Sequence, residues 1–394
     1  MPIIGGDYMI TKISGGIIIT DGREINANLY IANDKVQCIT PEDLPFDKEI
    51  DAAGRYVAPG FIDIHVHGGA GYEFVDGDFE ALKNAANIHG IHGTTTIYPT
   101  ISTYEYGKTA KALAEIKTSK DNAEIIPHIY GAHLEGPYFS PKQSGAQDPE
   151  FIRTPDKNEY EKLFSDFGDV IKRWSYAPEL ENADEFLEFL NKNNIVASAG
   201  HTDAEYDDVK RAYEKGMKLI THLYSCTSTI TRKSGFRILG VIETAYLYDD
   251  IDVETIADGC HLPAELLKLI YKIKGDEHMC LVTDSIRYGG MENIENEKSE
   301  NGNVAYVIED GVAKLADRSA FAGSIATADV LVRTCVKKVG ISLASAVKMM
   351  TEVPARIMGL TTKGKLCEGF DADVVIFDED INVYATIVGG KRVF

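Results

Sequence analysis

The chain has 394 residues, 44% of them hydrophobic, which is enough for a large barrel plus a smaller unit. Its formal net charge of −21 excludes non-specific binding to nucleic acid or to an anionic membrane surface, because binding to either one needs a basic face on the protein. The six cysteines are scattered without a Cys-x-x-Cys spacing, so we expect reduced thiols in a cytoplasmic protein.

The two ends of the chain share a β-rich character. Residues 1–8 lack a basic segment followed by an apolar stretch, and no apolar run reaches the length of a membrane span, so we expect neither secretion nor insertion. Residues 9–56 hold β-type runs broken by Asp-Gly and Asn-Asp turns, and the tail from residue 364 is β-type again. Neither piece is large enough to close its own core. We therefore predict one small β-sandwich domain built from both termini, residues 1–57 and 360–394.

Between these ends, short apolar runs alternate with helix-like stretches. Strand candidates begin near residues 61, 94, 126, 171, 195, 218, 251 and 279. Helical periodicity is clear over residues 79–92, 104–117, 184–193, 204–215 and 263–274. Thr202 or Asp203 offers an N-cap for the fourth of these helices, and Pro263 begins the fifth. Eight βα units predict an α/β fold, a TIM-like (β/α)8 barrel over residues 58–359, with a polar surface hairpin or flap near residues 288–310.

In such a barrel the functional side chains lie at the carboxyl ends of the strands. Six of the predicted strands end in groups that can bind a metal or move a proton. These groups are His65 and His67 after the first strand, Glu135 after the third, His201 after the fifth, His222 after the sixth, His261 after the seventh and Asp284 after the eighth. The sequence therefore predicts a divalent-metal site with a spare acid/base group at the barrel mouth.

Each member of this set has a plainer interpretation as well. His65 and His67 point to the same side of a strand, as shared metal ligands do, but such a pair is also found in purely structural strands. Glu135 is able to serve as a helix-start carboxylate, and Asp284 as a cap on the following turn. The other strand ends favour metal ligation for the first three residues and a general base for Asp284. For His261 a substrate-binding role and a structural role stay equally open.

At this point the residues resemble a known family. The run Pro59-Gly-Phe-Ile-Asp-Ile-His-Val-His67, followed by a barrel and flanked by a split β-domain, is similar to the amidohydrolase superfamily. Further motifs resemble its N-acetylglucosamine-6-phosphate deacetylase branch: His133-Leu-Glu-Gly-Pro-Tyr138, Gly200-His-Thr-Asp203, Thr221-His-Leu-Tyr224, Asp258-Gly-Cys-His261, Leu281-Val-Thr-Asp284 and Phe321-Ala-Gly-Ser324. Other branches place a carboxylated lysine at the end of strand four. Here that end reads Ser175-Tyr-Ala-Pro-Glu179, with no lysine.

The resemblance implies a set of roles. Glu135, His201 and His222 would hold the principal metal, while His65 and His67 would complete a second site shared with Glu135 or Asp284. It implies zinc or iron, one or two per subunit, an amino-sugar phosphate as the small-molecule substrate, and a homodimer. The substrate loops would be Ala146, Gln147, Ser225, Cys226, the segment 258–261 with His261, Phe321, Ala322 and Gly323.

The resemblance also implies a reaction, hydrolysis of an acetamide. Our hypothesis for its mechanism is that a metal-activated water attacks, that Asp284 accepts its proton and later protonates the departing amine, and that the metal and His261 stabilise the oxyanion. One departure concerns the substrate. Where the family carries an Arg-Glu-Pro-Gly element whose arginine meets the sugar phosphate, this chain has Arg232 and Lys233 in another context, and either one is able to supply the cation.

Several alternatives stay open for that reason. The substrate can be the galacto epimer or an unphosphorylated acetamido sugar. The chain can act as another amidohydrolase, on cyclic amides or as a deaminase. It can also be an inactive scaffold, although every expected ligand position is filled.

Overall fold

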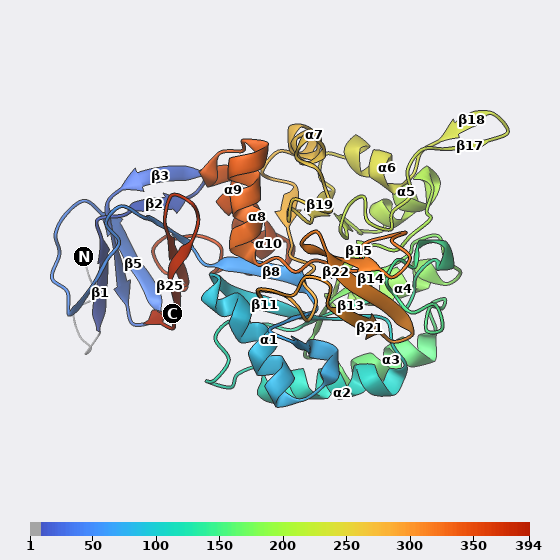
Figure 1. Ribbon diagram of the computed structural model, residues 1–394, viewed down its shortest axis with the longest axis horizontal. Coiled ribbons are helices and arrows are strands. Elements are labelled where there is room, and N and C mark those ends of the chain that lie inside the picture. The colour runs from blue at the N-terminus through green and yellow to red at the C-terminus, as the bar shows by residue number, and fades with distance from the viewer. Residues whose placement is uncertain (1–8) are drawn as a thin grey trace.

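The computed structural model describes residues 9–394. The expectation about an N-terminal targeting segment falls on residues 1–8, which lie outside the described residues. Figure 1 shows two parts side by side: the barrel with its helices, and a smaller β-rich part that contains β1 and β25. Among the described residues, no helix combines the length and apolar character needed to cross a membrane.

Eight parallel strands form the barrel, and the predicted (β/α)8 fold is confirmed. They are β8 (Phe61–Val66), β11 (Thr94–Ile101), β13 (Ala132–Glu135), β14 (Ile171–Tyr176), β15 (Val196–Ala199), β16 (Leu219–Ile220), β19 (Asp252–Thr255) and β20 (Met279–Leu281). All but β13 begin close to the predicted positions; β13 begins later, because a short β12 (His128–Ile129) pairs with β11 ahead of it. Every residue of β8 and β11 is buried, as expected for parallel strands covered on both faces.

The first and last barrel strands meet just beyond their ends. The backbone N–H of Asp284 donates to the carbonyl of His65 at 2.9 Å, and the N–H of His67 donates to the carbonyl of Ser285 at 2.8 Å. Three of the four residues that these hydrogen bonds join, His65, His67 and Asp284, belong to the predicted metal site. The closure of the barrel therefore brings the first and eighth strand ends into one place.

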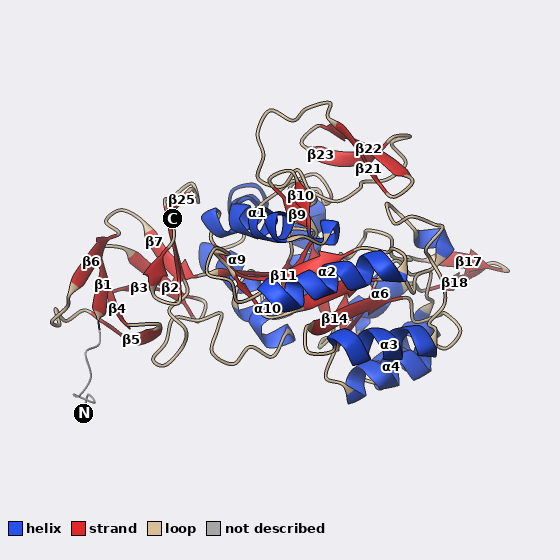
Figure 2. Ribbon diagram, turned by 90° about the horizontal axis from the view of Figure 1, so that it is seen from below, coloured by secondary structure: helices blue, strands red, loops and turns tan. Residues whose placement is uncertain are grey.

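Helices pack around the barrel (Figures 1 and 2). They are α1 (Phe79–Ile91), α2 (Tyr106–Ser119), α3 (Lys157–Phe167), α4 (Ala183–Lys192), α5 (Tyr206–Glu214), α6 (Val241–Leu247), α7 (Ala264–Lys274), α8 (Ala328–Thr334), α9 (Leu343–Met349) and α10 (Glu352–Ile357). The five predicted helices are confirmed, with Pro263 as the N-cap of α7. The predicted cap of α5 is wrong. Its N-cap is Glu205, because the Thr202 hydroxyl donates to Glu179 instead and the Asp203 backbone N–H does the same.

Strands from both termini share the smaller β-rich part. One sheet has the order β5-β4-β1-β6, and the other has the order β26-β25-β24-β7-β2-β3. Their bounds are β1 (Ile10–Ser14), β2 (Ile17–Thr20), β3 (Arg23–Asn26), β4 (Asn28–Ala32), β5 (Lys35–Thr40), β6 (Lys48–Asp51), β7 (Tyr56–Pro59), β24 (Val374–Phe377), β25 (Val383–Val388) and β26 (Lys391–Arg392). Ile13 and Leu29 from one sheet and Ile376 and Ile387 from the other belong to one buried apolar cluster. The domain boundaries at residues 57 and 360 stay predictions.

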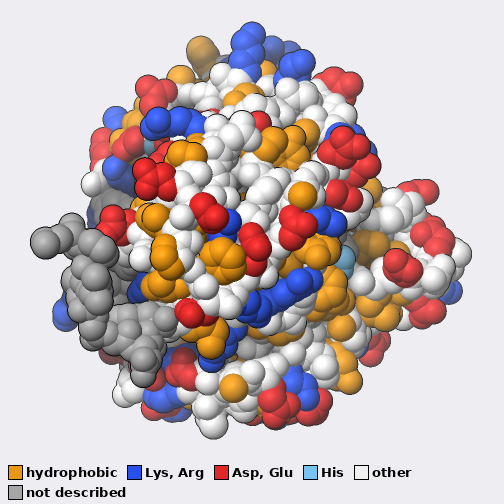
Figure 3. Space-filling model, turned by 90° about the vertical axis from the view of Figure 1, so that its left-hand side faces the viewer, with side chains coloured by type: hydrophobic (Ala, Val, Ile, Leu, Met, Phe, Trp, Pro, Cys, Tyr) orange, Lys and Arg blue, Asp and Glu red, His pale blue; other side chains and the backbone are white. Residues whose placement is uncertain are grey.

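The outer face of this part carries side chains of both charge signs, mixed with apolar ones (Figure 3). No single-sign field covers the part of this face that the structure describes. This described part of the face therefore lacks the continuous basic surface that binding to a nucleic acid backbone requires.

Two small sheets stand off the barrel. The predicted flap is a three-stranded antiparallel sheet of β21 (Lys298–Asn301), β22 (Val304–Glu309) and β23 (Val312–Leu315), seen at the top of Figure 2 near the short β9 (Gly68–Gly69) and β10 (Tyr72–Glu73). The second is a hairpin of β17 (Thr231–Lys233) and β18 (Phe236–Ile238), which projects from the far end of the barrel (Figure 1).

Candidate metal centre and substrate cavity

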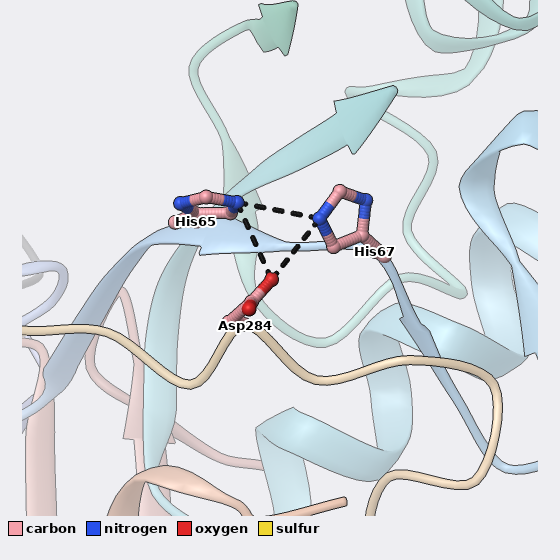
Figure 4. Close-up of side chains that lie close together, drawn as sticks. All are labelled: His65, His67 and Asp284. Atoms are coloured by element: carbon pink, nitrogen blue, oxygen red, sulfur yellow. Dashed lines mark hydrogen bonds and ion pairs between the residues drawn. The ribbon is translucent and has the colours of Figure 1, made fainter. Parts of the chain in front are cut away.

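Six side chains from five strand ends form two adjoining groups of metal-type donors. One group is His65, His67 and Asp284, and the other is Glu135, His201 and His222. Within each group the donor atoms all lie within 4.8 Å of one another, and all six residues are buried. Figure 4 shows the first group, with both imidazoles and the carboxylate pointing toward one another.

The backbone turns sharply where three of these residues stand. His201, His222 and Asp284 have φ angles of 46°, 27° and 48°, in or beside the left-handed region that few non-glycine residues adopt. A residue held in such a conformation costs of the order of 1–3 kcal/mol. Each of the three lies two or three residues beyond the end of a barrel strand. The backbone strain is therefore concentrated where the chain leaves the barrel strands, at residues whose side chains lie at the mouth of the barrel.

Glu135 lies between the two groups and contacts both. Its Oε1 is 3.0 Å from His222 Nε2 and 3.3 Å from His65 Nε2, and its Oε2 is 3.4 Å from His67 Nε2. On the other side, Asp284 Oδ1 lies 3.2 Å from His67 Nε2. A carboxylate placed in this way can bridge two cations or serve one of them.

Charge controls the protonation of this cluster. Burial by itself would raise the pKa of Glu135, but the surrounding imidazoles outweigh burial and hold that pKa well below its usual range. Burial likewise would lower the pKa of His67, yet hydrogen bonds to Asp284 and Glu135 raise it to about 10. The pKa of Asp284 is lowered, since the nearby imidazoles outweigh its burial. The carboxylates are thus ionised, which is the form that binds a metal ion.

The hydrogen bonds of the outer ring nitrogens of His201 and His67 show whether these residues fit a metal. His201 Nδ1 lies 2.9 Å from the backbone carbonyl of Gln143, which only accepts, so this nitrogen carries the hydrogen. His67 Nδ1 contacts the Ser102 hydroxyl at 3.0 Å. A metal ion would displace the proton on Nε2, and a ring with its remaining hydrogen on Nδ1 would then present the inward-facing Nε2 lone pair. Imidazole and carboxylate donors arranged in this way fit a divalent transition metal such as zinc or iron.

A buried ion pair between Glu254 and Arg173, which was not predicted from the sequence, contacts the site from the barrel interior. Glu254 Oε2 lies 3.1 Å from His65 Nδ1 and accepts the backbone N–H of His222 at 3.1 Å. Its other oxygen pairs with the Arg173 guanidinium, and both side chains have no exposed surface. These contacts lower the pKa of Glu254 to about 2 despite its burial. The sequence did indicate such a pair, because a charged residue in the middle of a buried strand requires a partner.

A cavity of about 500 Å³ opens above the cluster. Its walls hold nearly all the residues predicted to bind substrate: Ala146, Gln147, Ser225, Cys226, His261, Phe321, Ala322 and Gly323. Gln147 Nε2 donates to Glu135 at 2.6 Å while its Oε1 accepts the backbone N–H of Thr103 at 2.8 Å. Gln147 therefore orients the central carboxylate as well as lining the cavity.

His261 has a defined orientation in the wall. Its Nδ1 contacts Asp258 at 2.7 Å, and its ring lies 4.7 Å from the Phe321 ring. The Asp258 carboxylate accepts the hydrogen on Nδ1, so Nε2 is left for a ligand. This geometry favours the substrate-binding interpretation of His261 over the purely structural one.

The structure does not bring Arg232 and Lys233 to the cavity. Both lie on β17, where every residue is exposed, and neither lines the cavity walls. Lys233 pairs with Glu205 at 2.5 Å instead. Their role toward the substrate stays a prediction.

Comparison with known proteins agrees with this geometry. The model of the amidohydrolase family matches residues 56–393. The chain is 33% identical over 387 residues to the N-acetylglucosamine-6-phosphate deacetylase of Bacillus subtilis, with 96% of each chain covered, and 31% identical to that of Lysinibacillus sphaericus, with 95% of each covered.

Solved structures are similar over the whole chain. The N-acetylglucosamine-6-phosphate deacetylase of Pasteurella multocida has a TM-score of 0.89 at 28% identity and covers 98% of this chain and 99% of its own. A mutant of the Mycobacterium smegmatis enzyme, in complex with N-acetyl-D-glucosamine-6-phosphate, has a TM-score of 0.88 at 28% identity and covers 98% of this chain and all of its own. The chain therefore belongs to the amidohydrolase family, in the branch of the N-acetylglucosamine-6-phosphate deacetylases.

Proposed function

We propose that this protein is a metal-dependent deacetylase that hydrolyses the acetamide of N-acetylglucosamine 6-phosphate to glucosamine 6-phosphate and acetate, in amino-sugar catabolism. One observation carries the proposal. A chain similar to such deacetylases over 96% of its length also places six buried metal-type donors at the floor of one cavity. The cavity volume of about 500 Å³ falls in the range of small-molecule sites.

The metal would be zinc or iron, bound as one or two ions per subunit. Glu135, His201 and His222 would hold the principal ion, and His65 and His67 would complete a second site with Glu135 or Asp284. When bound, such an ion lowers the pKa of a water molecule and polarises a carbonyl group.

The chain's own residues would then divide the remaining work. Asp284 accepts the proton of the attacking water at a carboxylate oxygen and later returns it to the nitrogen of the departing amine, whose bond to the acetyl carbon breaks. Gln147 keeps Glu135 in place through its 2.6 Å hydrogen bond. His261, oriented by Asp258, presents Nε2 to the substrate from the cavity wall.

The decisive experiment is acetate release from three compounds: N-acetylglucosamine 6-phosphate, its galacto epimer and free N-acetylglucosamine. We expect the first to have the highest kcat/KM. A higher value for either of the others would reassign the substrate, and no release from any of them would overturn the deacetylase proposal.

A related substrate is the second candidate, because the predicted phosphate cations Arg232 and Lys233 lie outside the cavity. The same three-compound assay decides between these sugars. Adding hydantoins and purines to the assay tests for another amidohydrolase activity. Metal content of the purified protein tests the inactive scaffold, which would hold less than one ion per chain.

We also propose a cytoplasmic homodimer. Phe236 and Ile230, on and beside the β17–β18 hairpin, are 75% and 49% exposed, and a second copy would cover such apolar side chains. Sedimentation velocity at micromolar concentration measures the state directly. A single species with the mass of one chain would contradict the dimer.

A further inference from the structure

The flap reaches the cavity from outside the barrel. Residues from the flap and from the turn after it line the cavity and form its rim: Asn301, Tyr306, Lys314 and Arg318. Asn301 is the last residue of β21, directly before the two-residue turn Gly302-Asn303 at the tip of the flap. The two turn residues are exposed, whereas Asn301 is half-buried. Asn301 therefore stands where the flap meets the barrel.

The side-chain amide of Asn301 joins two segments at the barrel mouth. Its Nδ2 donates to the backbone carbonyl of Ala146 at 3.2 Å, in the loop after β13. Its Oδ1 accepts the hydroxyl hydrogen of Tyr104, in the loop after β11. The donor and the acceptor of one amide are thus used on different segments. A residue that belongs to neither segment therefore helps to fix the distance between them.

The same two segments hold Gln147. Its Oε1 accepts the backbone N–H of Thr103, the neighbour of Tyr104, at 2.8 Å, and its own backbone directly follows Ala146. From this position Gln147 Nε2 donates to Glu135 Oε2 at 2.6 Å. Gln147 keeps both hydrogen bonds only while the two segments stay at this spacing, because a hydrogen bond weakens as its distance and angle depart from their preferred values.

Further contacts seat the tip of the flap on the loop after β13. The Asn303 N–H donates to Asp148 Oδ2 at 2.8 Å. A Cβ at Gly302 would lie 2.5 Å from the same Oδ2, and the φ of Gly302 is 60°, so glycine permits this close approach. Ala146 packs against an apolar cluster that includes Tyr306. Polar and apolar contacts together therefore dock the flap on this loop.

We propose that Asn301 is a positioning residue of the reaction. Docked with the flap, it holds Gln147 in the geometry that keeps the Glu135 carboxylate in place for a metal ion. Asn301 acts on Glu135 through Gln147, so the position of the flap is coupled to the metal centre. The proposal rests on the proposed function for the metal at Glu135.

The test measures zinc affinity, with a competing chelator, in Asn301→Ala, in Gln147→Ala and in the double variant. Gln147→Ala removes a direct partner of Glu135, so zinc affinity should fall about 10- to 100-fold. Asn301→Ala should lower it about 3- to 10-fold, because only the hydrogen bonds behind Gln147 are lost. In the double variant, Asn301→Ala should add nothing to the loss caused by Gln147→Ala, as expected for two residues that act in series.

The matched control is Asn303→Ala, which makes the same substitution in the turn of the flap. The Asn303 side chain donates to Glu150 Oε2 at 3.0 Å and does not line the cavity. Its backbone N–H, which contacts Asp148, is kept in the variant. We expect zinc affinity within about twofold of the wild type, as for most exposed substitutions.

The proposal is overturned if Asn301→Ala binds zinc as tightly as Asn303→Ala does, because Asn301 would then be dispensable. It is also overturned if Asn301→Ala still lowers zinc affinity by about threefold or more in the Gln147→Ala background, since the effect would then bypass Gln147. A wild type that binds no zinc would overturn it too. These titrations use no sugar. A wild type that binds zinc but releases no acetate would therefore contradict the proposed function alone, and the three zinc titrations would still decide the role of Asn301.

Discussion

The floor of the cavity and its rim are built in opposite ways. On the floor, His65 is tied through Glu254 to Arg173, and all three side chains are fully buried. At the rim, Lys314 and Arg318 are paired with Asp310 and Glu309, and each of these ion pairs has one side chain that is at least half exposed. Removing one partner of a buried ion pair lowers the stability of the fold strongly, whereas removing one partner of an exposed pair lowers it little. The floor is thus a buried charge network, whereas each ion pair of the rim is in contact with water on one side.

The largest effect is expected on the floor, from Asp284→Asn. The amide cannot accept the proton of the attacking water, so kcat should fall by at least about 10³-fold, at the upper end of what general acid–base catalysis contributes. Metal content, measured by inductively coupled plasma mass spectrometry, should stay at or above one ion per chain, because Glu135, His201 and His222 are untouched. A kcat near the wild-type value would remove Asp284 from the mechanism.

Glu254→Gln should have the next largest effect, on stability and on metal binding together. It leaves the Arg173 guanidinium buried without its counter-charge, which typically costs about 3–5 kcal/mol. It also weakens the orientation of His65, and loss of such a supporting contact lowers metal affinity about 10- to 100-fold. Urea unfolding and metal titration with a competing chelator measure the two effects.

A double variant separates these two effects of Glu254. Arg173→Met, Glu254→Gln removes both charges, so most of the stability should return while the weakened metal binding should persist. Wild-type metal affinity in the double variant would show that Glu254 does not position His65.

A third prediction concerns a buried histidine that supports the floor from α1. His89 Nε2 contacts the Gly68 carbonyl at 2.9 Å, and burial lowers the pKa of His89 from 6.5 to about 4. Between these values the unfolded chain binds more protons than the folded one, so stability falls as pH falls from about 6.5 to about 4. The contribution lost is about 3 kcal/mol.

The variant His89→Gln isolates this contribution, because an amide can keep the hydrogen bond to Gly68 without titrating. Urea unfolding at pH 7.5, 6 and 4.5 should show a smaller acid loss in the variant than in the wild type. Equal losses in the two proteins would mean that His89 is not the titrating group.

The floor was predictable from the sequence, whereas the cations of the rim, Lys314 and Arg318, were not. The six donors stand at strand ends, and strand ends in a parallel barrel meet at one mouth, so spacing along the chain translates into proximity. Glu254 and Arg173 lie inside strands, where the sequence pattern predicts apolar contacts rather than a charge network.

The rim depends on which loop folds back on which, and no local pattern predicts that. Lys314 reaches the cavity only because residues 314–321 form a tight reversal. Thr202 shows the same limit at a smaller scale. It has the composition of a helix cap, yet its hydroxyl bonds to Glu179 from a neighbouring loop. Tertiary hydrogen bonds overrode a local preference there.

The smallest effect is expected at the outermost ion pair, between Lys233 and Glu205. Their side chains are 65% and 37% exposed, so Lys233→Gln should change the free energy of unfolding by less than about 1 kcal/mol. Urea unfolding at low and at high salt checks this, since any contribution should shrink further as salt screens the pair. A loss comparable with that of Glu254→Gln would mean that the hairpin is held as rigidly as the floor, and the contrast between the two regions would then fail.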